Sequence, residues 1–438
     1  MVSPIFIKNK TQNKSTKSLV GFVASRAHHS DIGGITPGSM PLAKEIYQEG
    51  LIIPPIKLVR KNCLDHGVMS LIMANVRTPE ERKGDFLAQM AANQRGVERM
   101  REIFSSHGDK EINQAMEQLL SYSERMTRRL IVSIPDGSYS FSDFMDDDGL
   151  NSYAIPIKVT ITIAHDQAVV DFSGSALQQI GSINAVEAIT FSAVSYVFRS
   201  LLGVDIPNNS GCMLPIQVIA PKGTIVNALS PSAVAGGNVE TSQRIVDVLL
   251  GALAQACPEK IPAASQGTMN NVTIGGYFSP ENNPGITSCG KPFVYYETIG
   301  GGTGASPKAD GVSSIHSHMT NTLNTPIEAL EYAYPLQIQR YSLRQGSGGS
   351  GEFYGGDGII RELKLLVDCQ VTLLTERRKF PPYGLAGGSP GKIGENSFIR
   401  DGVKHILPSK GTFFLKAGDL LRICSPGGGG YGIEVRSH

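Results

Sequence analysis

The sequence lacks the features that several large classes of protein need. Its 438 residues carry a formal net charge of only +1, so no overall field attracts nucleic acid or an anionic membrane surface. Its apolar runs, such as residues 248–254, are much shorter than the roughly 18 residues of a membrane span. The first 17 residues show no cationic start followed by an apolar stretch, as a secretory signal would. We therefore expect a cytoplasmic protein that binds neither nucleic acid nor membrane.

Motifs for several common chemistries are also missing. The six cysteines are scattered without a CxxC pair, which is typical of reduced thiols in the cytosol. No GxSxG sequence marks a nucleophilic serine, so a serine or cysteine hydrolase is not indicated. Many of the 49 glycines cluster, but no cluster ends in GK[ST] or has GxGxxG spacing between a strand and a helix. We interpret the clusters as tight turns or places where backbones approach closely, not as nucleotide sites.

Hydrophobic periodicity predicts both strands and helices. Strands are predicted over residues 2–7, 19–25, 157–163, 215–220 and 223–226. A helical pair is predicted over residues 78–130, because a start signal containing Pro79 precedes apolar residues at helical spacing. The break between its two helices is expected at residues 107–109.

Two later helices indicate how the layers pack. Residues 185–202 and 241–256 carry apolar side chains on more than one face, which favours burial against sheets. After residue 336 the chain is rich in strands and glycine. The predicted fold is therefore mixed α and β, with helices packed on β-sheets in a core of residues 1–335 and a strand-rich C-terminal region of residues 336–438.

Residues 25–34, SRAHHSDIGG, place two imidazoles and a carboxylate at a strand end before a glycine turn. Neutral imidazole and carboxylate are usual ligands of divalent metals. On a regular strand His28 and Asp31 would point to opposite faces, so both can bind one ion only if the backbone bends after His29. The alternative is a polar strand end with a hydrogen-bonded histidine.

A second histidine cluster lies in residues 310–324, where His316 and His318 are two residues apart. In a strand both imidazoles would face the same side, as a metal site requires. A functional role is favoured for the cluster. The alternative is that one histidine caps a turn or contacts substrate while the other is structural.

The charged run ERRK at residues 376–379 could hold a carboxylate. Short basic runs are usually solvated surface. No site is assigned to this run.

Seven motifs, in order along nearly the whole chain, resemble the hydantoinase B/oxoprolinase family. They are VGFVASRAHHSDIGGITPGSMP (20–41), EIYQEGLIIPPIKL (45–58), YYETIGGGTGA (295–305), HSHMTNTLNTPIEALE (316–331), GSGGSGEFYGGDGIIREL (346–363), PPYGLAGGSPGK (381–392) and PGGGGYG (426–432).

This resemblance implies a subunit of an ATP-dependent cyclic-amide hydrolase, acting on 5-oxoproline as in glutathione metabolism, on hydantoin or on a related lactam. A partner that is similar to hydantoinase A would bind ATP and activate the amide oxygen, so a hetero-oligomer is expected. This chain would open the ring with a bound divalent metal, zinc or manganese, and water.

The resemblance also implies roles for single residues. The metal ligand is His28, with His29 as the alternative. The catalytic residues are Asp31, His316, His318 and Asn321. The substrate-binding residues are Arg26, Thr320 and Asn324. The family's other metal ligands precede the strand at residues 2–7, so an N-terminally truncated chain is expected.

Two other functions stay open at this point. One is an inactive, truncated remnant that acts as a scaffold piece. The other is a subunit of the acetone-carboxylase type, which would need a further small partner.

Overall fold

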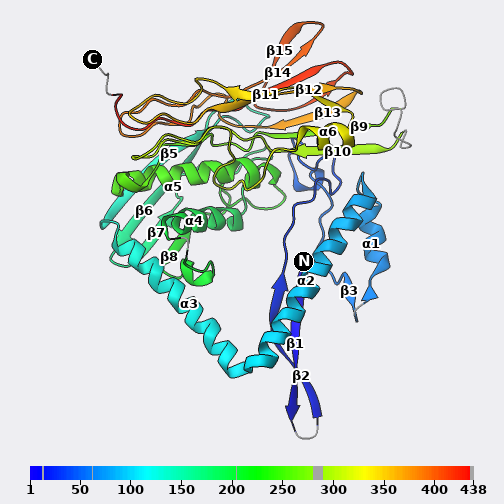
Figure 1. The fold of residues 1–438 in the computed structure, drawn as a ribbon, viewed down its shortest axis with the longest axis vertical. Coiled ribbons are helices and arrows are strands. Elements are labelled where there is room, and N and C mark those ends of the chain that lie inside the picture. The colour runs from blue at the N-terminus through cyan, green and yellow to red at the C-terminus, as the bar shows by residue number, and fades with distance from the viewer. Residues whose placement is uncertain (12–13, 62, 204, 280–289, 435–438) are drawn as a thin grey trace.

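The computed structural model describes residues 1–438 with the exception of 12–13, 62, 204, 280–289 and 435–438. The described chain has mixed α and β structure, as predicted, and Figure 1 shows its layers. Two packed sheets lie above helices α4 and α5, a third sheet flanks these helices, and a hairpin with two long helices projects away from the layers.

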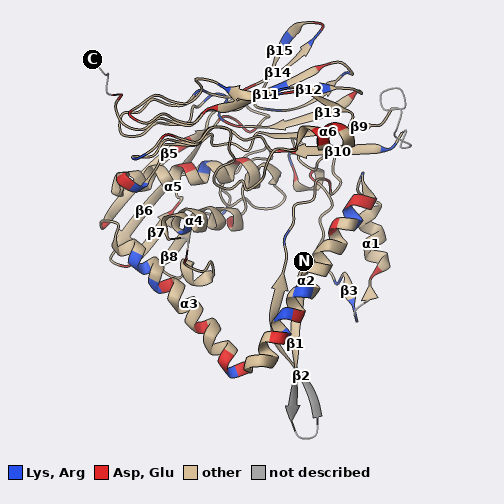
Figure 2. Ribbon diagram, viewed as in Figure 1, with Lys and Arg blue, Asp and Glu red and all other residues tan. Residues whose placement is uncertain are grey.

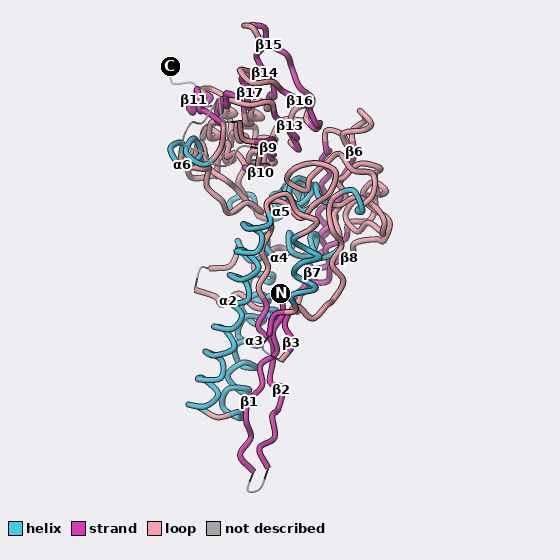
Figure 3. Tube along the Cα trace, turned by 90° about the vertical axis from the view of Figure 1, so that its right-hand side faces the viewer, coloured by secondary structure: helices cyan, strands magenta, loops and turns pink. Residues whose placement is uncertain are grey.

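The projecting arm is built from a hairpin and a helical pair. Strands β1 (Val2–Thr11) and β2 (Lys14–Ala24) pair antiparallel, and α2 (Pro79–His107) lies along them (Figures 1 and 3). Gly96 permits this contact, because a Cβ there would lie 2.7 Å from a methyl carbon of Val23. The helix α3 (Asp109–Val132) follows Gly108, whose φ of +79° ends α2 at the predicted break.

Charged residues of both signs are interspersed along α2 and α3 (Figure 2). Both helices expose most of their surface, so these charges keep the arm solvated. None of the helices in the described ranges is both long and apolar enough to cross a bilayer.

A four-stranded sheet forms the floor of the first core. Its strands, in spatial order, are β5 (Gly137–Met145), β6 (Ile155–Ala164), β7 (Gln167–Asp171) and β8 (Ile216–Ile219). The helix α5 (Ser242–Ala256) packs on β5 and β6, and α4 (Glu187–Leu201) packs on α5. Every residue from 242 to 253 is buried, so α5 has no face turned to solvent.

Two further sheets pack face to face and form the second core. One has the order β10 (Pro292–Glu297), β9 (Asn271–Tyr277), β13 (Cys369–Leu374) and β16 (Lys410–Leu415). The other has the order β11 (Leu336–Arg344), β12 (Gly358–Leu365), β17 (Leu420–Cys424), β14 (Glu395–Arg400) and β15 (Val403–Leu407). Residues such as Ile274, Leu363 and Ile423 fill the space between them.

Glycine clusters from distant parts of the chain meet beside these sheets. A Cβ on Gly302 would lie 1.8 Å from the carbonyl oxygen of Gly356, and a Cβ on Gly355 would lie 2.0 Å from that of Gly428. The amide of Gly428 donates to the carbonyl oxygen of Gly356 at 2.9 Å. No other residue fits at such distances, so the prediction of close backbone approach is confirmed.

Some local predictions were incomplete or wrong. Residues 223–226 were predicted as a strand but form turns, because they make only single bridges to residues 177 and 227. The short elements β3 (Val59–Arg60), β4 (Cys63–Leu64), α1 (His66–Met73) and α6 (Ile327–Ala333) were not predicted. The boundary at residue 335 stays a prediction, although the sheet that contains β9 and β13 takes strands from both sides of it.

The described cysteines agree with reduced thiols. Cys63 is exposed, and the four that are buried are Cys212, Cys257, Cys369 and Cys424. Cys289 lies outside the described residues.

Candidate functional site

The loop after β2 carries the first cluster of predicted site residues. The strand ends at Ala24, so His28 and Asp31 lie in irregular backbone and the opposite-face argument for a strand does not apply. Asp31 is fully buried, and both of its oxygens are occupied: Oδ2 accepts from the backbone amide of Arg77 and Oδ1 from its Nη1, each at 2.9 Å. Asp31 therefore fixes this loop, and it has no free oxygen to offer a substrate.

Asp31 is thus expected to matter for stability. Replacing it with alanine leaves the Arg77 guanidinium without its carboxylate, and we expect the free energy of unfolding to fall by about 1 to 3 kcal/mol. Urea unfolding measures this difference. Glu102→Ala, which removes the exposed pair with Arg99, serves as the control and should cost no more than about 0.5 kcal/mol. Equal losses in both variants would contradict the structural role of Asp31.

His29 is the histidine of this cluster that faces a cavity. Its ring stacks on Phe86, with centroids 4.7 Å apart and planes 18° apart. Its Nδ1 lies 3.5 Å from Asp85 Oδ2 and has no hydrogen-bond partner in the described chain. His28, by contrast, is exposed. The stacked ring is therefore held in place, with its Nδ1 buried beside Asp85.

The cavity beside His29 has a volume of about 660 Å³. Arg26 also lines it, and the remaining wall is mainly apolar, with Val2, Ile32, Ile53, Leu58, Ile72 and Phe86 among its residues. A cavity of this size with one guanidinium and one imidazole suits a small, partly apolar ligand.

The second cluster, residues 316–324, lies in a loop between β10 and α6. His318 has a φ of +55°, and the segment is not a strand. The prediction that both imidazoles face the same side, which required a strand, is therefore wrong. The Tyr196 hydroxyl lies 3.3 Å from Nδ1 of His318, whose Nε2 is buried without a partner among described residues. Burial lowers the pKa of His318 to about 4, so its imidazole is neutral at pH 7.

His316 is half-buried, and neither of its ring nitrogens has a hydrogen-bond partner in the part of the chain that the structure describes. Burial lowers the pKa of this imidazole as well, although the charge of Glu297 acts in the opposite direction. Two neutral imidazoles with unused nitrogens thus lie two residues apart in this loop. Such groups can accept protons or bind a ligand.

The other predicted residues of the second cluster differ in availability. Thr320 accepts a hydrogen bond from Gln243 Nε2 at 2.8 Å, and Asn324 donates to Glu297 Oε1 at 3.0 Å. Glu297 in turn pairs with the buried Arg361 at 2.8 Å. Asn321 is exposed. Thr320 and Asn324 therefore stabilise the loop, and Asn321 is the open side chain of the three.

The structure does not join the two clusters into one metal centre. Within the described ranges, no hydrogen bond, ion pair or ring contact connects residues 26–31 with residues 316–324. The same ranges contain no group of three or more His, Cys, Asp or Glu residues that could hold a metal ion. The residues present therefore do not fit a complete metal site, and they supply at most part of one.

A buried network of ion pairs was missed by the sequence analysis. Arg377 is fully buried, and its Nη2 lies 2.8 Å from Asp143 Oδ2 and 2.5 Å from Asp247 Oδ2. Arg244 lies 2.9 Å from the same Asp143 oxygen. The run at residues 376–379 was predicted as solvated surface, which is wrong for Arg377. The available signal was a pair of opposite charges, Arg244 and Asp247, three residues apart on a helix whose other faces are apolar.

Glu240 sits in the π-helical turn Gly237–Thr241 that leads into α5. Its Oε1 accepts from the Met269 amide at 3.0 Å and from Asn271 Nδ2 at 2.6 Å, whereas Oε2 has no partner among described residues. Burial raises the pKa of this carboxyl to about 8, and the charge of Glu376 acts in the same direction. Glu240 is therefore protonated at neutral pH.

Protonation of Glu240 predicts a pH dependence of stability. The pKa of Glu240 in the folded protein lies above the ordinary value of 4.5. The stability that the protonated carboxyl contributes is therefore complete below pH 4.5 and is lost as the pH rises through about 8. Between pH 5 and 8 we expect the unfolding free energy of the wild type to fall by at least about 1.4 kcal/mol more than that of Glu240→Gln. Urea unfolding at both pH values tests this, and parallel curves for the two proteins would contradict it.

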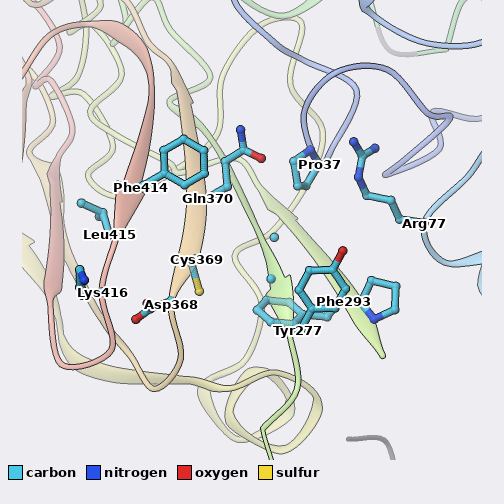
Figure 4. Close-up of a pocket in the computed structure, with 13 residues that line it drawn as sticks. Pro37, Arg77, Tyr277, Phe293, Asp368, Cys369, Gln370, Phe414, Leu415 and Lys416 are labelled. Carbon is cyan, nitrogen blue, oxygen red and sulfur yellow. The ribbon is translucent and has the colours of Figure 1, made fainter. Parts of the chain in front are cut away.

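A smaller cavity of about 400 Å³ lies at the edge of the sheet that contains β9 and β13 (Figure 4). Pro37 and Arg77 border it on one side, and Phe293, Tyr277 and Phe414 contribute aromatic rings. Arg77 connects it to the Asp31 loop. No predicted site residue lines it.

Comparison with known proteins supplies the family context. A family model described as hydantoinase B/oxoprolinase matches residues 1–434. An uncharacterised protein of Methanocaldococcus jannaschii is 41% identical over 433 residues, which cover 99% of this chain and 72% of that protein. The B component of a putative D-/L-hydantoinase from a Pseudomonas strain is 32% identical, and the match covers 98% of this chain and 72% of the relative.

Longer relatives and solved structures also match. The chain is 38% identical to 5-oxoprolinase 1 of Arabidopsis thaliana over 99% of its own length but spans only 34% of that protein. The ATP-dependent caprolactamase of Pseudomonas jessenii superposes with a TM-score of 0.85 at 28% identity, covering 99% of this chain and 74% of the other. An acetone carboxylase superposes at 0.84 with 17% identity, covering 98% and 62%, which shows a shared fold.

Proposed function

Because this chain belongs to the hydantoinase B/oxoprolinase family, we propose that it is the ring-opening subunit of an ATP-dependent cyclic-amide hydrolase. Its substrate would be 5-oxoproline, hydantoin or a related lactam, in keeping with the names of its relatives. The observation that carries the proposal is the cavity beside His29, which combines an apolar wall with a guanidinium and an immobilised imidazole.

Different groups of the cavity wall would contact different parts of such a substrate. The apolar wall takes the methylene groups of the ring. Arg26 binds a carboxylate or a carbonyl oxygen, since a guanidinium presents a fork of donors. His29 accepts or returns a proton near the amide, because Phe86 fixes its ring and Asp85 lies beside Nδ1.

In this proposal the loop of residues 316–324 contributes two neutral imidazoles. Burial lowers the pKa of both His316 and His318, so each can offer a neutral ring nitrogen to a ligand at neutral pH. Asn321 is open to a ligand. Asp31, Thr320 and Asn324 act as positioning residues because their side chains are engaged by Arg77, Gln243 and Glu297.

A divalent metal, zinc or manganese, belongs to the proposal, with His29 and the exposed His28 as the ligands from this chain. The described residues do not complete its coordination, so further ligands must come from outside them. No step of the reaction is assigned to the metal. Metal content of the purified complex, with and without the partner, tests this part.

ATP is proposed to bind to a partner that is similar to hydantoinase A, since this chain has no GK[ST] loop. The test is co-expression of the full chain with such a partner from the same organism, followed by purification of the complex. ATP-dependent opening of 5-oxoproline, hydantoin or caprolactam supports the function.

The same complex separates the alternatives. ATP-dependent carboxylation of acetone with bicarbonate, without ring opening, would replace the proposal with a carboxylase role. A stable complex without turnover of any of these substrates would indicate a scaffold.

A further inference from the structure

A cavity of about 830 Å³ lies away from both histidine clusters, between the loop of residues 147–153 and the strands β14 and β15. Four cationic side chains line it, namely Arg344, Arg378, Lys379 and Lys410, against two carboxylates, Asp147 and Glu395. The chain as a whole carries a net charge of only +1, so positive charge is concentrated in this cavity.

The two lysines are already compensated. Lys410 pairs with Glu376 and lies 3.4 Å from Asp147, and Lys379 lies 2.8 Å from the other oxygen of Asp147. The second lining carboxylate, Glu395, pairs with Lys404 outside the cavity. The excess charge therefore resides on the two arginines.

Neither arginine has a carboxylate bound to its guanidinium. Arg344 donates to the carbonyl oxygens of Ile393 at 2.6 Å and Ser425 at 3.1 Å. Arg378 donates to the side-chain oxygens of Asn270 at 2.7 Å and Asn396 at 2.6 Å and to the carbonyl oxygen of Glu376 at 2.7 Å, and its buried Nε has no partner in the described chain. Asp146, a carboxylate whose charge acts on Arg378, accepts instead from backbone amides of residues 378–380.

The two like charges also lie close enough to act on each other. Burial lowers the pKa of Arg378 to about 10, and the charge of Arg344 acts in the same direction, against the opposing charges of Glu240, Asp146 and Glu376. A side chain at position 394 would clash with this guanidinium, because a Cβ there would lie 2.8 Å from Arg378 Cζ. Glycine at this position lets the backbone pack directly on one face of Arg378.

From this arrangement we infer that the cavity is a binding site for a small oxyanion, a carboxylate or a phosphate, held between Arg344 and Arg378 with Lys379 at the mouth. Guanidinium groups are the donors that fit planar carboxylates and phosphates. An anion there would relieve the repulsion between the two arginines and bond the unused donors. The inference does not depend on the proposed catalytic function.

Titration calorimetry of the full chain with sodium phosphate and, separately, with sodium malonate tests the site. Both are compared with chloride at equal ionic strength, and the two probes distinguish a phosphate from a carboxylate preference. We expect saturable binding of at least one probe with one site per chain. Binding that does not saturate, or that chloride reproduces, overturns the inference.

Variants locate the site. Arg344→Met and Lys379→Met are expected to weaken binding by about tenfold or more, since each removes a charged donor. The matched control is Arg340→Met, on the same strand as Arg344 but exposed and outside the cavity. If Arg344→Met fails to fold, the affinity of Lys379→Met tests the inference instead, because the Lys379 side chain is 43% exposed. Unchanged affinity in Lys379→Met, or equal weakening in the control, overturns the inference.

Discussion

Arg377→Met is expected to lower the free energy of unfolding by about 3 to 5 kcal/mol. The Arg377 side chain is completely buried and its Nη2 contacts both Asp143 and Asp247. Methionine preserves most of the volume but removes the charge, so the carboxylate of Asp247, itself fully buried, loses its closest cation. Equilibrium urea unfolding of the full chain measures the change.

The control for Arg377 is Lys404→Met, which removes a half-exposed pair with Glu395. An exposed pair of this kind contributes less than about 1 kcal/mol. A loss for Arg377→Met as small as that of Lys404→Met would show that the buried network contributes little to stability.

His29→Ala is expected to reduce kcat/KM for ATP-dependent ring opening by about 100-fold or more, the usual scale for a lost proton-transfer group. If His29 is also a metal ligand, the metal content of the complex falls in parallel. The chain offers a closely matched control in His405, which stacks on Phe398 with centroids 4.7 Å and planes 15° apart, on the exposed hairpin of β14 and β15.

His405→Ala should leave kcat/KM unchanged, because it removes the same kind of ring stack outside the His29 cavity. An active complex in which His29→Ala and His405→Ala turn over equally fast would exclude the cavity beside His29 as the reaction site.

Local patterns predicted much of the fold. The helical pair, its break at Gly108 and the helices α4 and α5 follow from apolar periodicity and from a glycine with positive φ. The turn between β6 and β7 is local as well, and His165 occupies it with a φ of +56°. These features depend on residues that are near each other in sequence, which is why periodicity detects them.

Site geometry could not be predicted in the same way, because it depends on contacts between distant residues. The carboxylate of Asp31 is occupied by Arg77, 46 residues away, and Arg377 meets Asp247 across 130 residues. The sequence shows only the type of each side chain, so Asp31 was a plausible ligand and Arg377 a plausible surface residue. The roles of the individual site residues stay predictions until the variants are measured.

The position of β17 has a consequence for synthesis in the cell. This strand, residues 420–424, is translated after both β12 and β14, yet it lies between them in the middle of the sheet. Until the ribosome has completed it, β12 and β14 each expose an unpaired strand edge, the kind of edge on which nascent chains aggregate. We therefore expect this sheet to close only after β17 has been translated.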